Sequence, residues 1–208
     1  MTRAPDPAKK PALLEQIVDH FLDRSLSTLT FRGLATALGV STFTLVYHFG
    51  NRRQLIREII ESIATRRRGF EVTGDLDDID IDSYITGLRH TFDQALLPRN
   101  RALQRLEFEA QMLEALETEP GATRTAHDQL HELARRTLVA LGVDDDDALV
   151  EGRLLIDTFY GIQVGLVITR DDAQATAAFE RAIADHRARI ETLSAQGASA
   201  LSGSTRVP

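Results

Sequence analysis

The chain has 208 residues, 43% of them apolar, so it can bury the core of one large or two small domains and is not disordered overall. It has no cysteine, which excludes disulfides, thiolate metal sites and cysteine nucleophiles and makes a reducing cytoplasm the expected location. The net charge is −7, but residues 1–70 carry 11 Lys/Arg against 6 Asp/Glu, whereas residues 71–208 carry 13 against 25. This asymmetry indicates that the first part meets a polyanion, although a solvated basic surface gives the same pattern.

Apolar residues recur at helical spacing along most of the chain without sustained strand-type alternation, so the predicted fold is all-α. The first helices are predicted at 11–24, 30–38, 41–47 and 51–69, with Thr30 and Ser41 as N-caps and Gly39 as the turn between two of them. Residues 73–82 contain five aspartates and coincide with the change of charge sign, so we expect a domain border there. Five further helices are predicted, at 82–96, 99–118, 122–142, 147–169 and 173–194.

No segment suited to export or membrane insertion is expected. The N-terminus lacks an apolar run of signal-peptide length, and the uncharged stretch 33–51 is interrupted by Ser, Thr, His and Gly residues. The chain end, 196–208, is rich in Ser, Gly and Ala and is predicted to be a mobile, disordered tail.

Residues 30–55, TFRGLATALGVSTFTLVYHFGNRRQL, have the pattern of a helix-turn-helix. The motif needs a small residue where its helices cross, a turn residue that tolerates positive φ, and apolar residues that fasten both helices to a third. Ala35 and Gly39 meet the first two needs, and the apolar set is Leu34, Leu38, Val40 and Leu45. The third helix then directs short polar and aromatic side chains outward: Thr42, Phe43, Thr44, Tyr47 and His48. Such side chains suit base edges, phosphates and thymine methyls. An ordinary packed helix pair with a glycine turn is the alternative.

The same segment resembles the N-terminal domain of the tetracycline-repressor (TetR) family of regulators over roughly residues 11–60. The matching positions are Ala35, Gly39-Val40-Ser41, Thr44-Leu45, His48-Phe49 and Arg52. The resemblance implies a helix-turn-helix domain in 1–50, a linking helix in 51–72, a ligand-binding and dimerisation domain in 73–195, and a tail in 196–208. It also implies a DNA-binding set, in which Arg52 would bind a phosphate: Thr30, Arg32, Ser41, Thr42, Phe43, Thr44, Tyr47, His48, Arg52 and Arg53.

Two positions depart from the family pattern. Val46 stands where the family usually has a tyrosine, so a phosphate hydrogen bond is missing or has moved to Tyr47. Phe43 stands where a small residue is common, and its ring would lie against a base methyl or a sugar and alter the DNA sequence that is read.

For the second domain the resemblance implies a dimer interface formed by the helices near 147–169 and 173–194. The first of these is apolar nearly all around, and Gly161 and Gly165 would let a neighbouring helix approach closely, whether it belongs to the same chain or to a second copy. The family usually holds a ligand cavity in this domain. Candidate ligand-binding residues, most of which would serve equally well as core, are His90, Phe92, Leu103, Phe108, Gln111, Met112, Phe159, Tyr160 and Gln163.

His127 and His131 lie four residues apart on one face of a predicted helix, as a pair of metal ligands would. A third ligand is not evident in the sequence, so a solvated face that includes Asp128 and Glu132 is the favoured interpretation, and no metal or cofactor is predicted. The chain also lacks a phosphate-binding loop, a nucleophile elbow and a spaced acid/base pair, so it is not expected to be an enzyme.

Together these features predict a ligand-responsive regulator of transcription. The expected form is a homodimeric repressor that occupies a palindromic operator in double-stranded DNA and is released by a small-molecule effector. Activation instead of repression, or a regulator that binds no ligand, stays open. The alternative function is a small all-helical ligand carrier or enzyme whose N-terminal helix pair is incidental.

Overall fold

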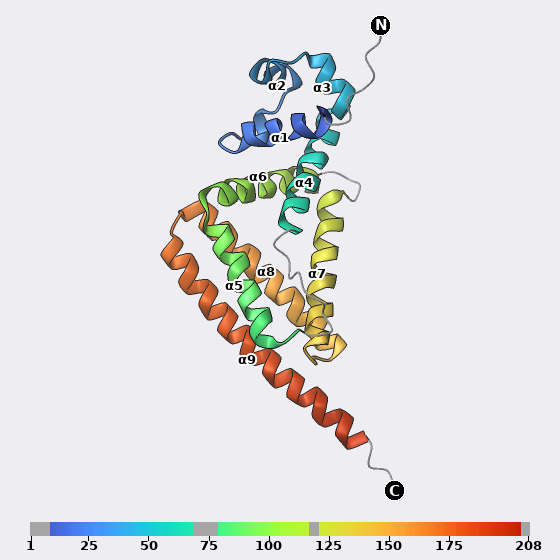
Figure 1. The fold of residues 1–208 in the computed structure, drawn as a ribbon, viewed down its shortest axis with the longest axis vertical. Coiled ribbons are helices and arrows are strands. Elements are labelled where there is room, and N and C mark those ends of the chain that lie inside the picture. Colours follow the sequence, from blue (N-terminus) through green and yellow to red (C-terminus); the bar gives the residue numbers. More distant parts are fainter. Residues whose placement is uncertain (1–8, 69–78, 117–120, 205–208) are drawn as a thin grey trace. The chain divides into compact units, whose positions relative to one another are not determined.

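The structure, a computed structural model, describes residues 9–68, 79–116 and 121–204, and within these ranges it is entirely helical (Figure 1). The predicted all-α class is therefore confirmed. Among the described helices, none combines the length and the apolar character that crossing a membrane requires. The elements in chain order are α1 (Lys9–Phe21), a short 3₁₀ helix η1 (Leu26–Thr28), α2 (Phe31–Leu38), α3 (Thr42–Phe49), α4 (Arg52–Arg68), α5 (Ile81–Leu96), α6 (Pro98–Ala115), α7 (Ala122–Ala140), α8 (Asp145–Thr169) and α9 (Asp172–Ser204).

The chain divides into two compact units. Residues 1–67 and 102–124 form the first, here called the head unit, and residues 68–101 and 125–208 form the second, the body unit. This division differs from the predicted one, because most of α6 packs with the N-terminal helices instead of with the body. Of the predicted border at 73–82, residues 73–78 lie outside the described residues.

The head unit has its own core. Ile17 of α1, Leu34 of α2 and Leu45 of α3 are buried in it together with Leu106 of α6. From α4, five apolar residues at helical spacing join them, namely Leu55, Ile56, Ile59, Ile60 and Ile63. One face of α4 is thus buried in the head unit.

The body unit is built around α8 and α9, which run side by side (Figure 1). Phe92 of α5 stacks on Phe179 of α9 with ring centroids 4.1 Å apart, and Phe159 of α8 meets Phe179 edge-on at 5.2 Å. A buried polar cluster lies in the same unit. The Tyr84 hydroxyl is 3.1 Å from His186 Nε2, and the His186 ring faces Glu151.

The C-terminal end differs from the prediction. The predicted tail begins at 196, but α9 continues to Ser204. Alanine, glutamine and leucine are strong helix formers, and five such residues within 195–201 favour extension of the helix over the glycine and serine that suggested a tail.

Candidate nucleic-acid interface

Local side-chain contacts begin both helices of the predicted helix-turn-helix. The Thr30 hydroxyl accepts a hydrogen bond from Gly33 N–H at 3.1 Å, and the Ser41 hydroxyl accepts one from Thr44 N–H at 3.0 Å. Gly39 ends α2 at φ 66°, in the left-handed region that favours glycine. These three predicted roles are confirmed, and they fix the turn between α2 and α3.

One side of α3 is buried and the other is exposed to solvent. Leu45 and Phe49, four residues apart, are buried in the head core. The opposite side exposes Phe43 by 78%, Tyr47 by 62% and Val46 by 47%, and Thr42 is exposed beside them. The Phe43 and Tyr47 rings stack on each other with centroids 6.4 Å apart. The helix therefore presents a short aromatic and apolar surface to solvent.

This exposed surface is rotated slightly from the predicted one. Thr44 and His48 are only partly exposed. The Thr44 hydroxyl lies 2.8 Å from the Ser41 hydroxyl, so these two hydroxyl groups serve the cap of α3. Val46, treated as a departure from the family pattern, belongs to the exposed set. With Leu45 and Phe49 buried, helical geometry places Phe43 and Tyr47 on the outer face, while Val46 lies at the side of the helix and Thr42 is exposed in its first turn.

Arginines flank this surface, whereas α3 itself carries no lysine, arginine or acidic residue. Arg32 on α2 and both Arg52 and Arg53 at the start of α4 are exposed. One Arg52 nitrogen donates to the Leu26 carbonyl at 3.3 Å, so this side chain also fastens α4 to η1. A guanidinium has five N–H donors, which leaves others to meet an anion.

The start of α4 has a reciprocal cap that the sequence analysis missed. Gln54 N–H donates to the Asn51 side-chain oxygen at 3.0 Å, and Asn51 N–H donates to the Gln54 side-chain oxygen at 3.1 Å. The signal was present as Asn and Gln three residues apart. Gly50 precedes them at φ 65°, and a Cβ there would collide with the Gln54 side chain. The turn between α3 and α4 thus depends on glycine for its conformation, and a Cβ there would displace the Gln54 side-chain oxygen from Asn51 N–H.

A second missed feature ties α6 to the end of α1. Arg105 donates to the carbonyls of Phe21 and Arg24 at 2.6 and 2.9 Å, capping the last turn of α1. Glu109 accepts from the Ser25 hydroxyl and from Ser27 N–H. Burial acts to raise the pKa of Glu109, but the hydrogen bonds from Ser25 and backbone N–H groups, together with Arg105, outweigh it and lower the pKa overall.

The predicted ligand-binding residues divide between the two units. Leu103, Phe108, Gln111 and Met112 lie on α6 in the head unit, and the remaining five lie on α5 and α8 in the body unit. Gln111 is buried and donates to Glu107 at 3.1 Å, whereas Met112 is 65% exposed. In the body, Phe92 is buried in the aromatic cluster, Gln163 is buried, Phe159 and Tyr160 are half-buried, and His90 is exposed.

Known proteins resemble this chain in structure. No protein-family model matches it, and no curated protein does. A TetR from Acinetobacter baumannii AYE superposes with a TM-score of 0.61 at 18% sequence identity, covering 89% of this chain and 97% of that chain. A TetR transcriptional regulator from Legionella pneumophila superposes with a TM-score of 0.59 at 15% identity, covering 92% and 98%. The multidrug binding protein EbrR, solved with imidazole, gives 0.56 at 15% identity, covering 87% and 90%.

These similarities extend over nearly the whole of each chain. At identities of 15–18% they establish the fold, which is an N-terminal helix-turn-helix followed by a helical C-terminal region. The predicted fold class is confirmed in both parts.

Proposed function

We propose that the chain is a regulator of transcription that binds double-stranded DNA through α3. The observation that carries the proposal is the open side of α3, where Thr42, Phe43, Val46 and Tyr47 are exposed while Leu45 and Phe49 hold the helix from beneath. A short helix of this kind fits the major groove, where thymine methyls and base edges can be contacted by apolar and short polar groups.

The cations around α3 suit the DNA backbone. Arg32, Arg52 and Arg53 lie on the elements before and after the recognition helix, where they would contact phosphates and set its orientation in the groove. Since α3 itself has no formal charge, we assign base reading to its aromatic and threonine side chains and affinity to the flanking arginines.

The same proposal includes a homodimer, because one short recognition helix reads too few bases for specificity and two-fold symmetry matches a palindromic operator. We assign the interface to α8 and α9. Their described surface includes a groove lined by Leu154, Thr158, Ala182 and Asp185. An added Cβ at Gly161 or Gly165 would meet nothing within 4 Å, which leaves room for a partner helix. Apolar side chains are exposed along α8: Leu149, Val150, Leu154, Val164 and Ile168.

We further propose that a small-molecule effector binds the chain and weakens operator binding, so that the dimer represses by occupancy. The solved EbrR, which shares the fold, is named as a multidrug binding protein and holds imidazole, which supports a small-molecule site. By linkage, effector and operator lower each other's affinity by the same factor. Within the head unit, the contacts of Arg105 and Glu109 join α6 to the end of α1 and to Ser25 and Ser27, so a shift of α6 would move the N-terminal helices.

The decisive experiment is selection of duplexes from a random pool, followed by a salt titration of the winning duplex. Six arginine contacts per dimer give an expected slope of log affinity against log salt of about −5. Two chains should bind per duplex. A ligand carrier or enzyme with an incidental helix pair would enrich no sequence and show no such slope, and that result would refute the proposal.

A further inference from the structure

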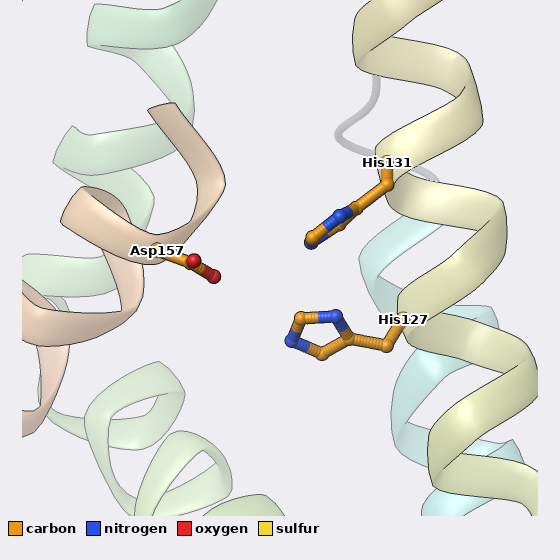
Figure 2. Close-up of side chains that lie close together, drawn as sticks. All are labelled: His127, His131 and Asp157. Atoms are coloured by element: carbon orange, nitrogen blue, oxygen red, sulfur yellow. The ribbon is translucent and has the colours of Figure 1, made fainter. Parts of the chain in front are cut away.

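Two histidines and an aspartate converge in the body unit. His127 and His131 project from α7, and Asp157 faces them from α8 (Figure 2). One ligating atom from each residue lies within 4.8 Å of the other two. The sequence shows the histidine pair without a third partner, because Asp157 is brought to it only by the packing of α8 against α7.

The two imidazoles are half-buried instead of forming the solvated face that the sequence favoured. Their ring centroids are 4.5 Å apart, and the His127 ring also packs on Tyr160 at 5.3 Å. The Nε2 atom of His131 is buried and has no hydrogen-bond partner among the described residues. A buried polar atom without a partner is costly, and a metal ion would satisfy it.

Asp157 is held only weakly by its present partner. Arg153 Nε donates to its Oδ2 at 2.8 Å, but the two side chains are 63% and 49% exposed. An exposed ion pair of this kind contributes little, so a doubly charged ion can take over the carboxylate.

We propose that His127, His131 and Asp157 bind one Zn²⁺ ion, which ties α7 to α8. Two imidazoles and one carboxylate favour zinc over Mg²⁺ or Ca²⁺, which prefer oxygen ligands alone. The same donor set can hold Fe²⁺, but Fe²⁺ binds such sites more weakly than Zn²⁺. Ligand atoms around a tetrahedral zinc lie about 3.3 Å apart, so the donors must draw together, chiefly by rotation of the exposed Asp157 side chain.

Three protein ligands leave the fourth position to water or to an added small ligand. The site goes beyond the proposed function and does not depend on it. It lies entirely in the body unit, so zinc binding can be measured whether or not the head binds DNA.

The test uses the full, untagged chain and Zn²⁺ in competition with a chromogenic chelator. One equivalent of Zn²⁺ should bind per chain. His127→Ala, His131→Ala and Asp157→Asn should each weaken Zn²⁺ affinity at least about tenfold, because even the loss of a group that only hydrogen-bonds to a metal ligand costs about that much. His90→Ala is the matched control, because it removes an exposed imidazole from the same unit and should leave the affinity unchanged. Asp157→Asn keeps the shape of an exposed side chain, so its loss of binding cannot be assigned to misfolding.

Arg153→Gln sharpens the test, because it releases the Asp157 carboxylate and removes a nearby cation. We expect it to bind Zn²⁺ several-fold more tightly than the wild-type chain. Co²⁺ in the site should show the visible absorption of a low-symmetry complex with nitrogen ligands, and this signal should vanish in His131→Ala. Absence of stoichiometric zinc binding, or binding that survives in all three ligand variants, would overturn the proposal.

Discussion

Three helices of the head unit, α2, α3 and α4, differ from three of the body unit, α5, α8 and α9, in the charge at their N-termini. In the head, α2, α3 and α4 have no acidic residue in their first turns. In the body, α5 begins with Asp82, α9 with Asp172, and α8 with three aspartates at 145–147. The N-terminus of a helix carries a partial positive charge that an acidic side chain can neutralise. These body helices therefore neutralise their own ends, whereas those around the recognition helix leave theirs available to an external anion.

This comparison shows why the net charge of −7 is a poor guide to the partner. Acidic residues concentrate in the body, where they cap helices and pair with arginines. The exposed apolar residues of the head unit and those of the body unit also differ in arrangement. On α3 they form a short patch among arginines, and on α8 they run along a helix of 25 residues. The first patch suits DNA and the second suits another protein surface.

The largest effect is expected from Tyr47→Glu, which places a negative charge on the open side of α3. The side chain is 62% exposed, so folding should be unaffected. A lost base contact costs about 1–3 kcal/mol, and a dimer loses two, so operator affinity should fall by roughly 30-fold or more. Fluorescence anisotropy with the selected duplex measures this. Leu116→Glu, at a site 85% exposed away from α3, should bind normally, and equal affinity in both variants would contradict the assignment.

Gly50→Ala should be the most destabilising change at a head glycine. The positive φ of Gly50 costs a non-glycine residue about 1–3 kcal/mol, and displacement of the Gln54 side chain removes its hydrogen bond with Asn51 N–H, one of the two bonds of the α4 cap and worth about 1 kcal/mol. Urea unfolding should therefore show a loss of about 2–4 kcal/mol. Hydrogen exchange should locate the loss in α3 and α4, and protection unchanged there would refute the role of this turn.

Gly161→Ala in the body is the matched contrast. It lies within α8, where an added Cβ meets nothing within 4 Å, so the folded chain should gain up to about 1 kcal/mol. If α8 forms the dimer interface, the same methyl group should weaken dimerisation, which sedimentation at several concentrations detects. A dimer of unchanged strength would place the interface elsewhere.

A smaller effect depends on pH and is confined to the body. Burial lowers the pKa of His186, with Arg189 acting in the same direction and Glu151 opposing them, and Tyr84 faces the ring from α5. The folded chain thus favours the neutral imidazole. The contribution of neutral His186 to the free energy of unfolding is complete above about pH 6.5 and is lost as the pH falls through the lowered pKa. The unfolding free energy should drop more between pH 7.5 and 5.5 in the wild-type chain than in His186→Gln. An equal drop in both would exclude His186 as the source.

The smallest effect is expected from Arg53→Ala. Removing one phosphate contact per head should weaken binding to all duplexes alike and make the salt slope less steep by about 1.8 for the dimer. Arg181→Ala, at an exposed position of α9, should leave the slope unchanged. A change of preferred sequence in Arg53→Ala would instead mean that this residue reads bases.

Local features of the fold were predictable and distant contacts were not. Thr30, Ser41 and Gly39 act on backbone groups within a few residues, so their roles follow from the sequence alone. The outward positions of Phe43 and Tyr47 on α3 also follow from helical spacing once Leu45 and Phe49 lie inward, whereas the exposure of Val46 does not follow from that spacing. By contrast, Arg105 at the end of α1 and Asp157 beside the histidine pair depend on helices that meet only in the folded chain.

Because α6 supplies Leu106 to the head core and Arg105 to the last turn of α1, the head unit is assembled from two separate stretches of sequence. A gene fragment that stops after α4 would leave apolar surface uncovered and would remove the Arg105 donor from the carbonyls of Phe21 and Arg24. Such a fragment should express as an aggregating protein. Under the proposed function, a chimera that takes its DNA specificity from another protein of this fold must therefore transplant residues 102–124 together with the first four helices.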